Sequence, residues 1–500
     1  MSIVHFPRSM RGAGVSRSPR SAASLLLAVA LGACSMDGPT ESPKPTARTS
    51  DIATDAPTHG SADSLRTLAA TKGIVALAPA PVVRKELVAL GQALMFDPIV
   101  SGNRTMTCAT CHLPQIATGD GRNLSIGEGG IGFGPNRQLG RGQVIPRNAP
   151  ALFNLATLKQ LFWDGRVSLD SAGSFHTPAS TQLTAQMSGV FEFGAVSAIG
   201  MFPVTSRTEM RGFVGRAQTL GPVAGNELAL FADSDFTGIW NGLMRRLGAL
   251  PEYQRMFEAA YPGTPFSAMT FAHASNAMAG FMVARLSFND SPWDRFLAGN
   301  DAALPPDAFR GANTFMTSKC AGCHSGSLFT DGKSRNVALA QFGPGEGNGP
   351  SGHDDFGRMN VTGVATDRYA FRTSPLRNVE LSGPYGHAGQ FADLRGFVDH
   401  YSDSDIKLAQ YDVSQIDPSL RGTLLPTVAE ILATRSGALN GLFFTQAQID
   451  DLTAYMRALT DPAARNLQRL TPSRVPSGLP VPQLPASPAF ASVAAVPARH

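Results

Sequence analysis

Two Cys-x-x-Cys-His motifs constrain this 500-residue chain more than any other feature of its sequence. They comprise Cys108, Cys111 and His112 in the first motif and Cys320, Cys323 and His324 in the second. The pattern is typical of c-type haem attachment, in which two thiols add across the haem vinyl groups and the His becomes the proximal iron ligand. A redox dithiol or half of a zinc site is the alternative for one such motif. Because the chain has only 10 His residues, two chance matches are not expected, and we predict two covalently bound haem c groups.

The beginning of the chain predicts export. Four Arg residues precede the apolar stretch 25–33, and small residues lead into Cys34, the only Cys outside the two motifs. A basic region, a short apolar region and small residues before a cleavage site are typical of a secretory signal. Residues 31–34 also resemble a bacterial lipobox, in which the Cys is lipidated; an ordinary signal peptide that contains a Cys is the alternative. We therefore predict a lipoprotein-type signal peptide at residues 1–33 and a periplasmic protein that Cys34 anchors to a membrane.

Composition narrows the remaining classes. Without the four Arg residues of the leader, 38 basic residues balance 38 acidic ones, and no basic run predicts binding to nucleic acid. No segment after the leader has 18 uncharged apolar residues, so no membrane-spanning helix is expected. The 51 Gly and 36 Pro residues indicate many loops. We expect a mainly α fold in which two cytochrome c-like haem domains, built of helices and long loops, pack against each other.

The pattern along the chain divides it into four segments after the leader. Residues 34–80 are rich in Pro, Thr, Ser and Asp and predict a disordered tether. One haem motif falls in each of two predicted domains, an N-terminal haem domain at 81–298 and a C-terminal haem domain at 299–461. Residues 462–500 are rich in Pro and Ala and predict an extended or disordered tail.

Apolar residues at helical spacing predict the main helices of both domains. The predicted helices cover residues 82–96, 240–261, 272–288 and 305–319, and a last helix begins at Thr445 as its N-cap. Residues 291–295 are expected to close the first domain.

Two Gly-rich segments stand out between these helices. Residues 127–132 match G-x-G-x-x-G, but no strand run precedes them, so dinucleotide binding is not predicted. Residues 343–352 form a second Gly-rich loop to which the sequence assigns no chemistry.

Six short segments match a known family: Leu-Gly-x3-Met-Phe-Asp at 90–97, Arg-Asn-Ala-Pro at 147–150, Phe-Trp-Asp-Gly-Arg at 162–166, Thr-Glu-Met at 208–210, Phe-Arg-Thr at 371–373 with Leu-Arg-Asn at 376–378, and Pro-Tyr-Gly-His-Ala-Gly at 384–389. Together with the two spaced haem motifs, they resemble the bacterial di-haem cytochrome c peroxidase family, which includes the MauG-type enzymes. The resemblance covers residues 82–461. It implies that the N-terminal haem meets peroxide and that the C-terminal haem passes electrons.

The resemblance also assigns roles to single residues. Glu209 is expected to move a proton between the two peroxide oxygens, and Pro203 to shape the pocket above the iron. Trp163 is expected to lie between the haems and to carry electrons, and Arg372 to lie at the haem edges with a propionate as its partner. The alternatives are a surface carboxylate for Glu209 and plain core packing for Trp163.

A calcium site between the haems is a further implication of the resemblance. Asn148, with backbone carbonyls near Ser382 and Pro384, matches that site in the family. Oxygen-only ligands suit calcium.

Departures from the family pattern bear on both irons. Many relatives have a second His ligand where this chain has Glu128, so we expect His112 to be the only protein ligand of the first iron unless Met106 or His176 binds it. The family's pocket Gln is Ile199 here, and Ser318 replaces a Trp that the quinone-forming enzymes use to reach a protein substrate. These two departures change the pocket and remove the known substrate route.

The second iron is expected to take its other ligand from Tyr401. The peroxidases have a Met at that position and the MauG-type enzymes a Tyr. His400 or Met359 is the alternative ligand. A thioether favours Fe(II), whereas a phenolate is hard and anionic and favours higher oxidation states.

Two enzymatic functions follow from the resemblance. The first is a periplasmic peroxidase that reduces hydrogen peroxide to water with electrons from a small cytochrome c or cupredoxin. The second is a MauG-like oxidase that uses high-valent iron to oxidise a protein side chain or a small organic substrate. A pure electron-transfer protein would need two six-coordinate haems, which Glu209 and the open first iron argue against.

Overall fold

The structure is a computed structural model of the chain that describes residues 61–214 and 225–484. The described residues all lie in one compact unit. The predicted signal peptide, Cys34 and the tether up to residue 60 lie outside the described residues. In the two described ranges, no helix has the length and apolar character that crossing a membrane requires.

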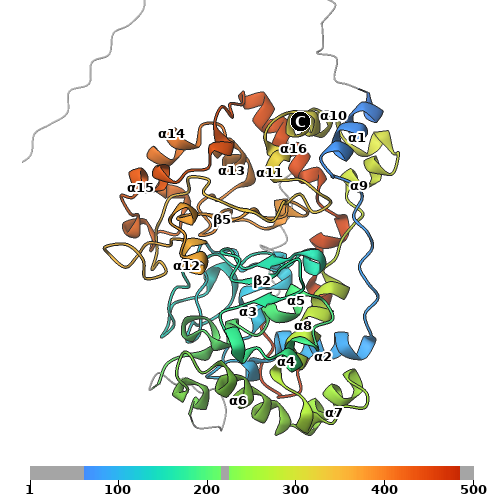
Figure 1. Cartoon of the computed structure of the whole chain (residues 1–500), viewed down its shortest axis with the longest axis vertical. Coiled ribbons are helices and arrows are strands. Elements are labelled where there is room, and N and C mark those ends of the chain that lie inside the picture. The colour runs from blue at the N-terminus through green and yellow to red at the C-terminus, as the bar shows by residue number, and fades with distance from the viewer. Residues whose placement is uncertain (1–60, 215–224, 485–500) are drawn as a thin grey trace, which may run out of the picture. The chain divides into compact units, whose positions relative to one another are not determined.

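Helices dominate the regular structure, as the sequence predicts (Figure 1). The α-helices are α1 (Ala62–Thr71), α2 (Lys85–Phe96), α3 (Cys108–Cys111), α4 (Ala185–Ser188), α5 (Ala195–Ile199), α6 (Phe236–Gly248), α7 (Pro251–Ala260), α8 (Phe271–Arg285), α9 (Pro292–Leu297), α10 (Pro306–Thr317), α11 (Cys320–Cys323), α12 (Met359–Thr362), α13 (Leu394–His400), α14 (Ser404–Ala409), α15 (Val428–Ala433) and α16 (Gln446–Ala458).

Only short strands accompany the helices in the described ranges. An antiparallel sheet of order β1-β2-β3 pairs Gln160 with Ser168 and Ser168 with His176. A two-stranded antiparallel sheet pairs Ser334 of β4 with Arg372 of β5. The strands are β1 (Gln160–Leu161), β2 (Val167–Leu169), β3 (Phe175–His176), β4 (Ser334–Arg335) and β5 (Phe371–Arg372).

The predicted helices are present, with one of them divided in two. Thr445 is the N-cap of α16, and its hydroxyl accepts a hydrogen bond of 3.2 Å from the Gln448 N–H in a capping box. The predicted helix at 240–261 is two helices, α6 and α7. Pro251 explains the break, because proline cannot continue a helix but suits the first position of the next one.

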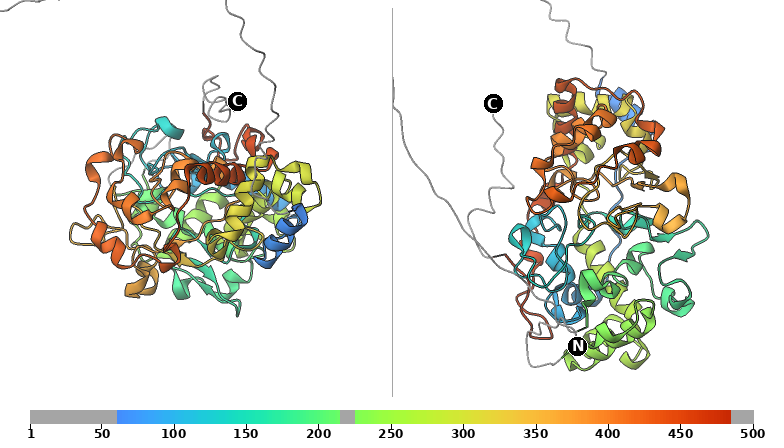
Figure 2. Two further views of the ribbon diagram at one scale, coloured as in Figure 1. Left: turned by 90° about the horizontal axis from the view of Figure 1, so that it is seen from above. Right: turned by 90° about the vertical axis from the view of Figure 1, so that its left-hand side faces the viewer.

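Each half of the chain is built on a crossed pair of helices that meet at a glycine. A Cβ on Gly91 of α2 would lie 1.9 Å from the carbonyl oxygen of Ala277 in α8, and a Cβ on Gly311 of α10 would lie 1.9 Å from that of Asp451 in α16. Only glycine permits so close an approach. In both halves, the helix that precedes the haem motif therefore packs against a later helix of the same half. Figures 1 and 2 show α10 and α16 side by side.

Two large hydrophobic cores correspond to these pairs. One is centred on α2, α6 and α8 and the other on α10 and α16. The prediction that residues 291–295 close the first domain is wrong, because Trp293 lies in the second core. Its ring centroid is 5.4 Å from that of Phe296 and 5.1 Å from that of Tyr455. The change from one core to the other falls before α9.

The predicted tether at 34–80 is wrong for its last part. Residues 62–71 form α1, which begins at the N-cap Ser61 and buries Leu65 and Ala69 in the second core. Arg66 Nε donates a 2.9 Å hydrogen bond to the Phe296 carbonyl. The high Pro, Ser and Thr content of residues 34–80 predicted disorder for the whole stretch, although this short amphipathic segment is helical.

The predicted tail at 462–500 is also ordered where the structure describes it. Leu467 and Leu470 pack into the first core, and the Ser477 hydroxyl donates a 2.5 Å hydrogen bond to the buried Asp97. Residues 485–500 lie outside the described part. Each end of the described chain thus completes the core of the opposite half.

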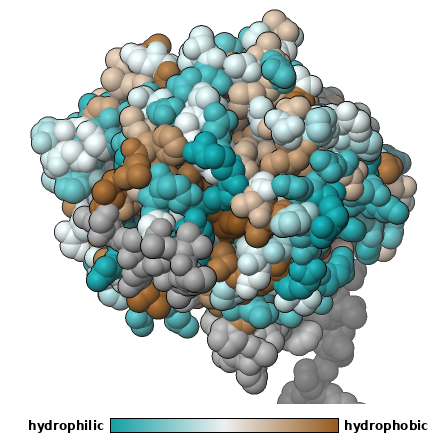
Figure 3. All heavy atoms as spheres, turned by 90° about the horizontal axis from the view of Figure 1, so that it is seen from below, coloured by the Kyte–Doolittle hydropathy of each residue, from teal (hydrophilic) through white to brown (hydrophobic). Residues whose placement is uncertain are grey.

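One face of the molecule has mixed polarity. In Figure 3, hydrophobic side chains lie in small groups separated by hydrophilic ones. Such scattered exposed apolar residues are usual on globular proteins.

Candidate functional site

Each Cys-x-x-Cys-His motif lines a cavity of its own. The first cavity, of about 1370 Å³, is lined by Cys108, Cys111 and His112 and, among other residues, by Glu209, Pro203, Ile199 and Trp163. The second, narrower cavity is lined by Cys320, Cys323 and His324 together with Arg372 and Tyr401. The structure therefore brings the predicted attachment residues of each motif together in one cavity.

The two motif histidines are oriented in the same way. His112 Nδ1 is 3.0 Å from the Thr118 carbonyl oxygen, and His324 Nδ1 is 3.0 Å from that of Phe329. A carbonyl at Nδ1 selects the tautomer whose Nε2 is free to bind a metal. Burial lowers the pKa of both histidines, so each ring is neutral, as an iron ligand must be.

The four motif thiols do not resemble reactive cysteines. Burial raises the pKa of Cys108 and of Cys111 to about 12, whereas redox-active cysteines have lowered pKa values. Within residues 61–214 and 225–484, no cluster of three or more His, Cys, Asp or Glu residues can hold a metal ion. The raised pKa values argue against the redox-dithiol alternative.

Arg372 fits the acidic edge of a haem. Its side chain is buried, its Nε donates a 3.3 Å hydrogen bond to the Phe162 carbonyl, and its Nη1 has no hydrogen-bond partner among the described residues. Burial lowers its pKa to about 10, which still leaves it cationic. A buried cation with a free donor on the wall of the second cavity suits a carboxylate such as a haem propionate.

Glu209 lies in a π-helical turn, η7 (Arg207–Arg211), which is a rare element that often marks functional sites. The turn begins at Ser206, whose hydroxyl accepts a 3.2 Å hydrogen bond from the Glu209 N–H. The Gly-rich loop at 127–132 packs directly on this turn. A Cβ on Gly127 would lie 1.7 Å from the Thr208 carbonyl, and Glu128 N–H donates a 2.9 Å hydrogen bond to the Glu209 carbonyl. This loop positions the Glu209 backbone, which accounts for its glycines.

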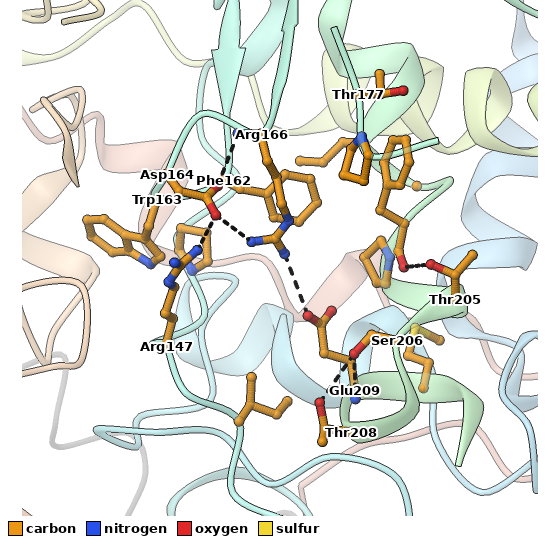
Figure 4. A pocket seen from close by; sticks show the side chains of 18 of the residues that line it. Arg147, Phe162, Trp163, Asp164, Arg166, Thr177, Thr205, Ser206, Thr208 and Glu209 are labelled. Atoms are coloured by element: carbon orange, nitrogen blue, oxygen red, sulfur yellow. Dashed lines mark hydrogen bonds and ion pairs between the residues drawn. The ribbon is translucent and has the colours of Figure 1, made fainter. Parts of the chain in front are cut away.

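A chain of ion pairs leads away from Glu209 (Figure 4). Arg166 Nη2 is 3.7 Å from Glu209 Oε1, and Arg166 Nη1 is 3.2 Å from Asp164 Oδ2. Arg147 Nη1 lies 2.5 Å from the same Asp164 oxygen. Burial raises the pKa of Glu209, and Arg166 opposes that rise. Burial thus favours the neutral form of the Glu209 carboxyl, and the nearby Arg166 favours its charged form.

Trp163 lies at the boundary of the two cavities. It lines both of them, as do Asn148 and Pro150. Its Nε1 donates a 2.8 Å hydrogen bond to the Asn148 carbonyl, and its own carbonyl accepts one of 2.8 Å from the Arg372 N–H. The indole is therefore fixed between the two attachment motifs.

Tyr401 lies in the second cavity with His324, at the end of α13. The alternatives are placed differently. His400 is buried outside this cavity, with Nε2 2.8 Å from the Val337 carbonyl oxygen, and Met359 does not line the cavity. Met456 of α16 does line it, although the sequence gave no reason to single it out. Burial raises the pKa of Tyr401, so the phenol is neutral unless a cation binds it.

The three residues predicted to bind calcium line the same cavity. Asn148, Ser382 and Pro384 all line the second cavity. Asn148 Nδ2 donates hydrogen bonds of 2.8 and 3.2 Å to the Arg122 and Asn123 carbonyls. This leaves the amide oxygen of Asn148 available as a ligand.

The structure also gives the positions of the residues by which this chain departs from the family pattern. Glu128 is buried outside the first cavity, where it accepts a hydrogen bond from the Thr105 hydroxyl. Met106 and His176 both line the first cavity. The Nε2 atom of His176 also lies 3.0 Å from Oδ2 of Asp170. Ser318 ends α10, and its hydroxyl oxygen accepts a 3.3 Å hydrogen bond from the Cys320 N–H.

Sequence reasoning missed the charged wall of the first cavity. Arg147, Asp164 and Arg166 lie in matched segments but received no role, and Glu346 belongs to the Gly-rich loop without assigned chemistry. Glu346 lines the first cavity with Glu209. No local signal marks it, because only the fold brings the loop to this cavity.

Comparisons with known proteins agree with this geometry. A model of the family described as di-haem cytochrome c peroxidase matches residues 85–302. The chain is 30% identical over 318 residues to the methylamine utilization protein MauG of Methylorubrum extorquens, covering 63% of this chain and 68% of that protein. It is 30% identical over 337 residues to the cytochrome c551 peroxidase of Pseudomonas aeruginosa, covering 65% and 75%.

Solved structures show the same fold. A MauG-like protein associated with microbial copper homeostasis matches with a TM-score of 0.50 and 23% identity over 78% of this chain and 95% of that one. The diheme peroxidase BthA from Burkholderia thailandensis matches with a TM-score of 0.51 and 20% identity over 77% and 88%.

Proposed function

This chain belongs to the di-haem cytochrome c peroxidase family, and we propose that it reduces hydrogen peroxide to water with electrons from a small periplasmic cytochrome c or cupredoxin. The observation that carries the proposal is the position of Glu209, whose carboxyl lines the same cavity as Cys108, Cys111 and His112. When bound, the haems supply an iron at which peroxide can react and a second centre that carries electrons. His112 and His324 would hold the two irons, and the four thiols would hold the porphyrins.

Glu209 moves the proton. Its carboxylate takes a proton from one oxygen of peroxide and returns it to the other, which leaves as water. Burial raises its pKa towards the working pH, which is where a general acid–base group is most effective. Arg166 at 3.7 Å limits that rise and orients the carboxyl, and Pro203 and Ile199 form the adjacent wall.

The haem content and the peroxide reaction test this function together. We expect a pyridine haemochrome of two haems per chain that survives acid–acetone extraction, and oxidation of a reduced cytochrome c or cupredoxin that depends on peroxide. One haem per chain, or no donor oxidation, would contradict the proposal.

The coordination of the first iron is tested by the spectrum of the resting protein. Glu128 lies outside the first cavity, which supports His112 as the only protein ligand. We expect a high-spin ferric signal from the first haem by electron paramagnetic resonance. Two low-spin signals at rest would show that Met106 or His176 binds the iron.

The two hydrophobic cores support a division into two cytochrome c-like domains that pack against each other. Each core holds the helix before one haem motif and a later helix that crosses it at a glycine. Trp163 and Asn148 line both cavities, so the contact between the proposed domains runs between the two haem sites.

A MauG-like oxidation of a protein side chain or a small organic molecule is the second candidate function. Tyr401 on the wall of the second cavity favours it, because a phenolate ligand stabilises oxidised iron and a thioether does not. A peroxide reaction that proceeds without any added electron donor and leaves an oxidised organic product would support this function over the first.

Calcium is proposed between the cavities. Asn148, Ser382 and Pro384 line the same cavity, and the Asn148 amide and the backbone carbonyls near Ser382 and Pro384 can supply oxygen ligands. Removal of calcium with a chelator is expected to lower peroxide turnover, and added calcium to restore it. Turnover that is unchanged by chelation would contradict the site.

Export and lipid anchoring through Cys34 complete the proposal. A haem c protein assembled outside the cytoplasm has the periplasm as its compartment, and the leader at 1–33 supports that route.

A further inference from the structure

The Gly-rich loop at 343–352 brings a second glutamate into the first cavity. The loop follows the second haem motif in sequence, yet Glu346 and Glu209 line the same cavity. Its shape is fixed by backbone hydrogen bonds from Glu346 N–H to the Asp354 carbonyl at 2.9 Å and between Asn348 and Asp354 at 3.1 and 3.3 Å. Glu346 is therefore held at the cavity by an ordered loop.

Glu346 is not needed to neutralise its arginine neighbour. Its Oε1 lies 3.5 Å from Arg147 Nε. The same guanidinium already makes two hydrogen bonds to Asp355, at 2.6 and 2.8 Å, and one of 2.5 Å to Asp164. A structural ion pair between Glu346 and Arg147 would be redundant with these shorter contacts.

The carboxyl groups around this part of the cavity outnumber the arginines by one, four to three, when Glu346 is counted. The charged or titratable side chains around this part of the cavity are Arg147, Arg166, Arg358, Asp164, Asp355, Glu209 and, in the same loop, His353. Arg147 and Arg166 are matched by Asp164, whose pKa is lowered to about 2, and by Asp355, whose pKa is also lowered. Arg358 Nη1 donates to the backbone carbonyls of Asp164 and Gly165 at 3.0 and 2.9 Å.

Two like charges in one cavity favour protonation of one of them. Burial is the largest cause that raises the pKa of Glu346, and the charge of Glu346 in turn raises the pKa of Glu209. The two carboxyls are thus coupled, and each responds to the protonation of the other.

The Glu346 side chain is more exposed to solvent than the Glu209 side chain, so a proton that comes from solvent reaches Glu346 first. The Glu346 side chain is 35% exposed and that of Glu209 23%. Glu346 lies at the rim, in contact with both solvent and cavity. Reduction of one peroxide to two waters takes up two electrons from the donor and two protons, and those protons must enter this cavity.

We propose that Glu346 is the residue through which protons enter the first cavity, an inference that rests on the proposed peroxidase function. The O–H bond of the Glu346 carboxyl breaks, and its proton passes through water to the Glu209 carboxylate, where a new O–H bond forms. Glu346 then takes a proton from hydronium or a buffer acid in the solvent. No electron moves in this step.

The first test uses Glu346→Gln, which keeps the shape and removes the proton, with Glu346→Asp as the conservative variant and Glu86→Gln as the control. Glu86 is a surface carboxylate on α2 outside both cavities. We expect kcat for peroxide to fall by about tenfold or more in Glu346→Gln, within the range of acid–base groups, with an unchanged KM. Glu346→Asp should recover most of the rate. Haem content of two per chain would show that the variants are folded.

Rescue by a small weak acid separates proton delivery from a structural role. At fixed pH and ionic strength, increasing acetate should raise kcat of Glu346→Gln and leave the wild type and Glu86→Gln unchanged. A full rate in Glu346→Gln, or a reduced rate that acetate does not raise, would overturn the proposal.

A second measurement needs no turnover. Infrared difference spectra of the resting protein in ²H₂O, recorded across pH, report protonated carboxyl groups. Glu346→Gln should remove one titrating band and lower the pKa of the Glu209 band, which Glu209→Gln identifies. A Glu209 band with the same pKa in both proteins would overturn the coupling.

If the wild type itself fails to reduce peroxide, the proposed function is wrong. The titration still decides whether the charge of one carboxyl changes the pKa of the other.

Discussion

Trp163 donates a 2.8 Å hydrogen bond from its indole Nε1 to the carbonyl of Asn148, and both residues line both haem-attachment cavities. The Trp163→Phe variant loses this bond and the larger indole ring. We expect slower oxidation of the electron donor by peroxide with both haems retained. The lost, partly buried hydrogen bond should cost about 1 kcal/mol of unfolding free energy.

Trp240→Phe provides the matched control for Trp163. The Trp240 Nε1 also donates a 2.8 Å bond to a backbone carbonyl, that of Met201, but Trp240 lines neither cavity. It should lose comparable stability without slowing donor oxidation. Equal rates in the two variants would remove Trp163 from electron transfer.

Glu209→Gln should slow the reaction with peroxide by about 10²–10⁴-fold, the usual contribution of a general acid–base group. The amide keeps the shape of the side chain and cannot carry the proton. Stopped-flow measurement of the peroxide reaction checks the rate, and the haem content checks the fold. A rate equal to that of the wild type would show that Glu209 is a bystander.

Glu128→Gln should stabilise the protein near neutral pH. Burial raises the pKa of Glu128, and its Oε2 has no hydrogen-bond partner among the described residues. A carboxyl with a raised folded-state pKa stabilises the fold at low pH, and that stability is lost as the pH rises through the folded-state value.

The gain from Glu128→Gln therefore has a defined pH window. It should be absent below the ordinary value of 4.5 and then grow by about 1.4 kcal/mol for each pH unit up to the folded-state pKa, because the buried carboxyl is harder to ionise than the unfolded one and the amide carries no charge. Thermal unfolding across pH measures it, with Glu86→Gln as the exposed control. A constant difference at all pH values would show that ionisation of Glu128 plays no part.

Tyr401→Met should change the second haem if Tyr401 binds its iron. A thioether ligand raises the reduction potential, and a Met–iron charge-transfer band should appear in the near infrared. Met456→Leu is the control, since Met456 lines the same cavity. A spectrum that changes in Met456→Leu and stays constant in Tyr401→Met would make Met456 the ligand.

Cys34→Ser should release the protein from the membrane fraction into the soluble periplasmic extract, because a serine cannot carry the lipid. Fractionation and immunoblotting measure the distribution. A variant that stays with the membranes would show that another feature holds the protein there.

The haem motifs and the helices were predictable because they rest on local signals, whereas the roles given to Glu209, Trp163 and Tyr401 rest on the family resemblance and stay predictions. In each Cys-x-x-Cys-His motif the two Cys residues begin and end one short helix and the His is its C-cap. Apolar spacing together with a Thr N-cap located α16 within a residue. Pro251 was equally visible, yet periodicity alone joined α6 and α7. The break needed the chemistry of proline as well as the apolar pattern.

The remaining features depend on long-range contacts. Glu346 and Glu209 meet only after the chain folds, and no property of residues 343–352 points to the first cavity. Composition was misleading for α1. Four of its apolar residues pack in the second core, which is distant in sequence, although the flanking residues are polar. Trp293 was assigned to the wrong half because its neighbours in sequence say nothing of Tyr455, its neighbour in space.

Because each end of the described chain completes the core of the opposite half, neither half can form its full interior alone. A ten-residue helix such as α1 is unstable alone, and its partners in α9 and α10 follow it by more than 200 residues in the chain. Conversely, the core around the first haem motif lacks Leu467, Leu470 and the Ser477–Asp97 hydrogen bond until the last part of the chain arrives. A chain cut between the halves therefore gives two fragments that each lack a piece of their interior.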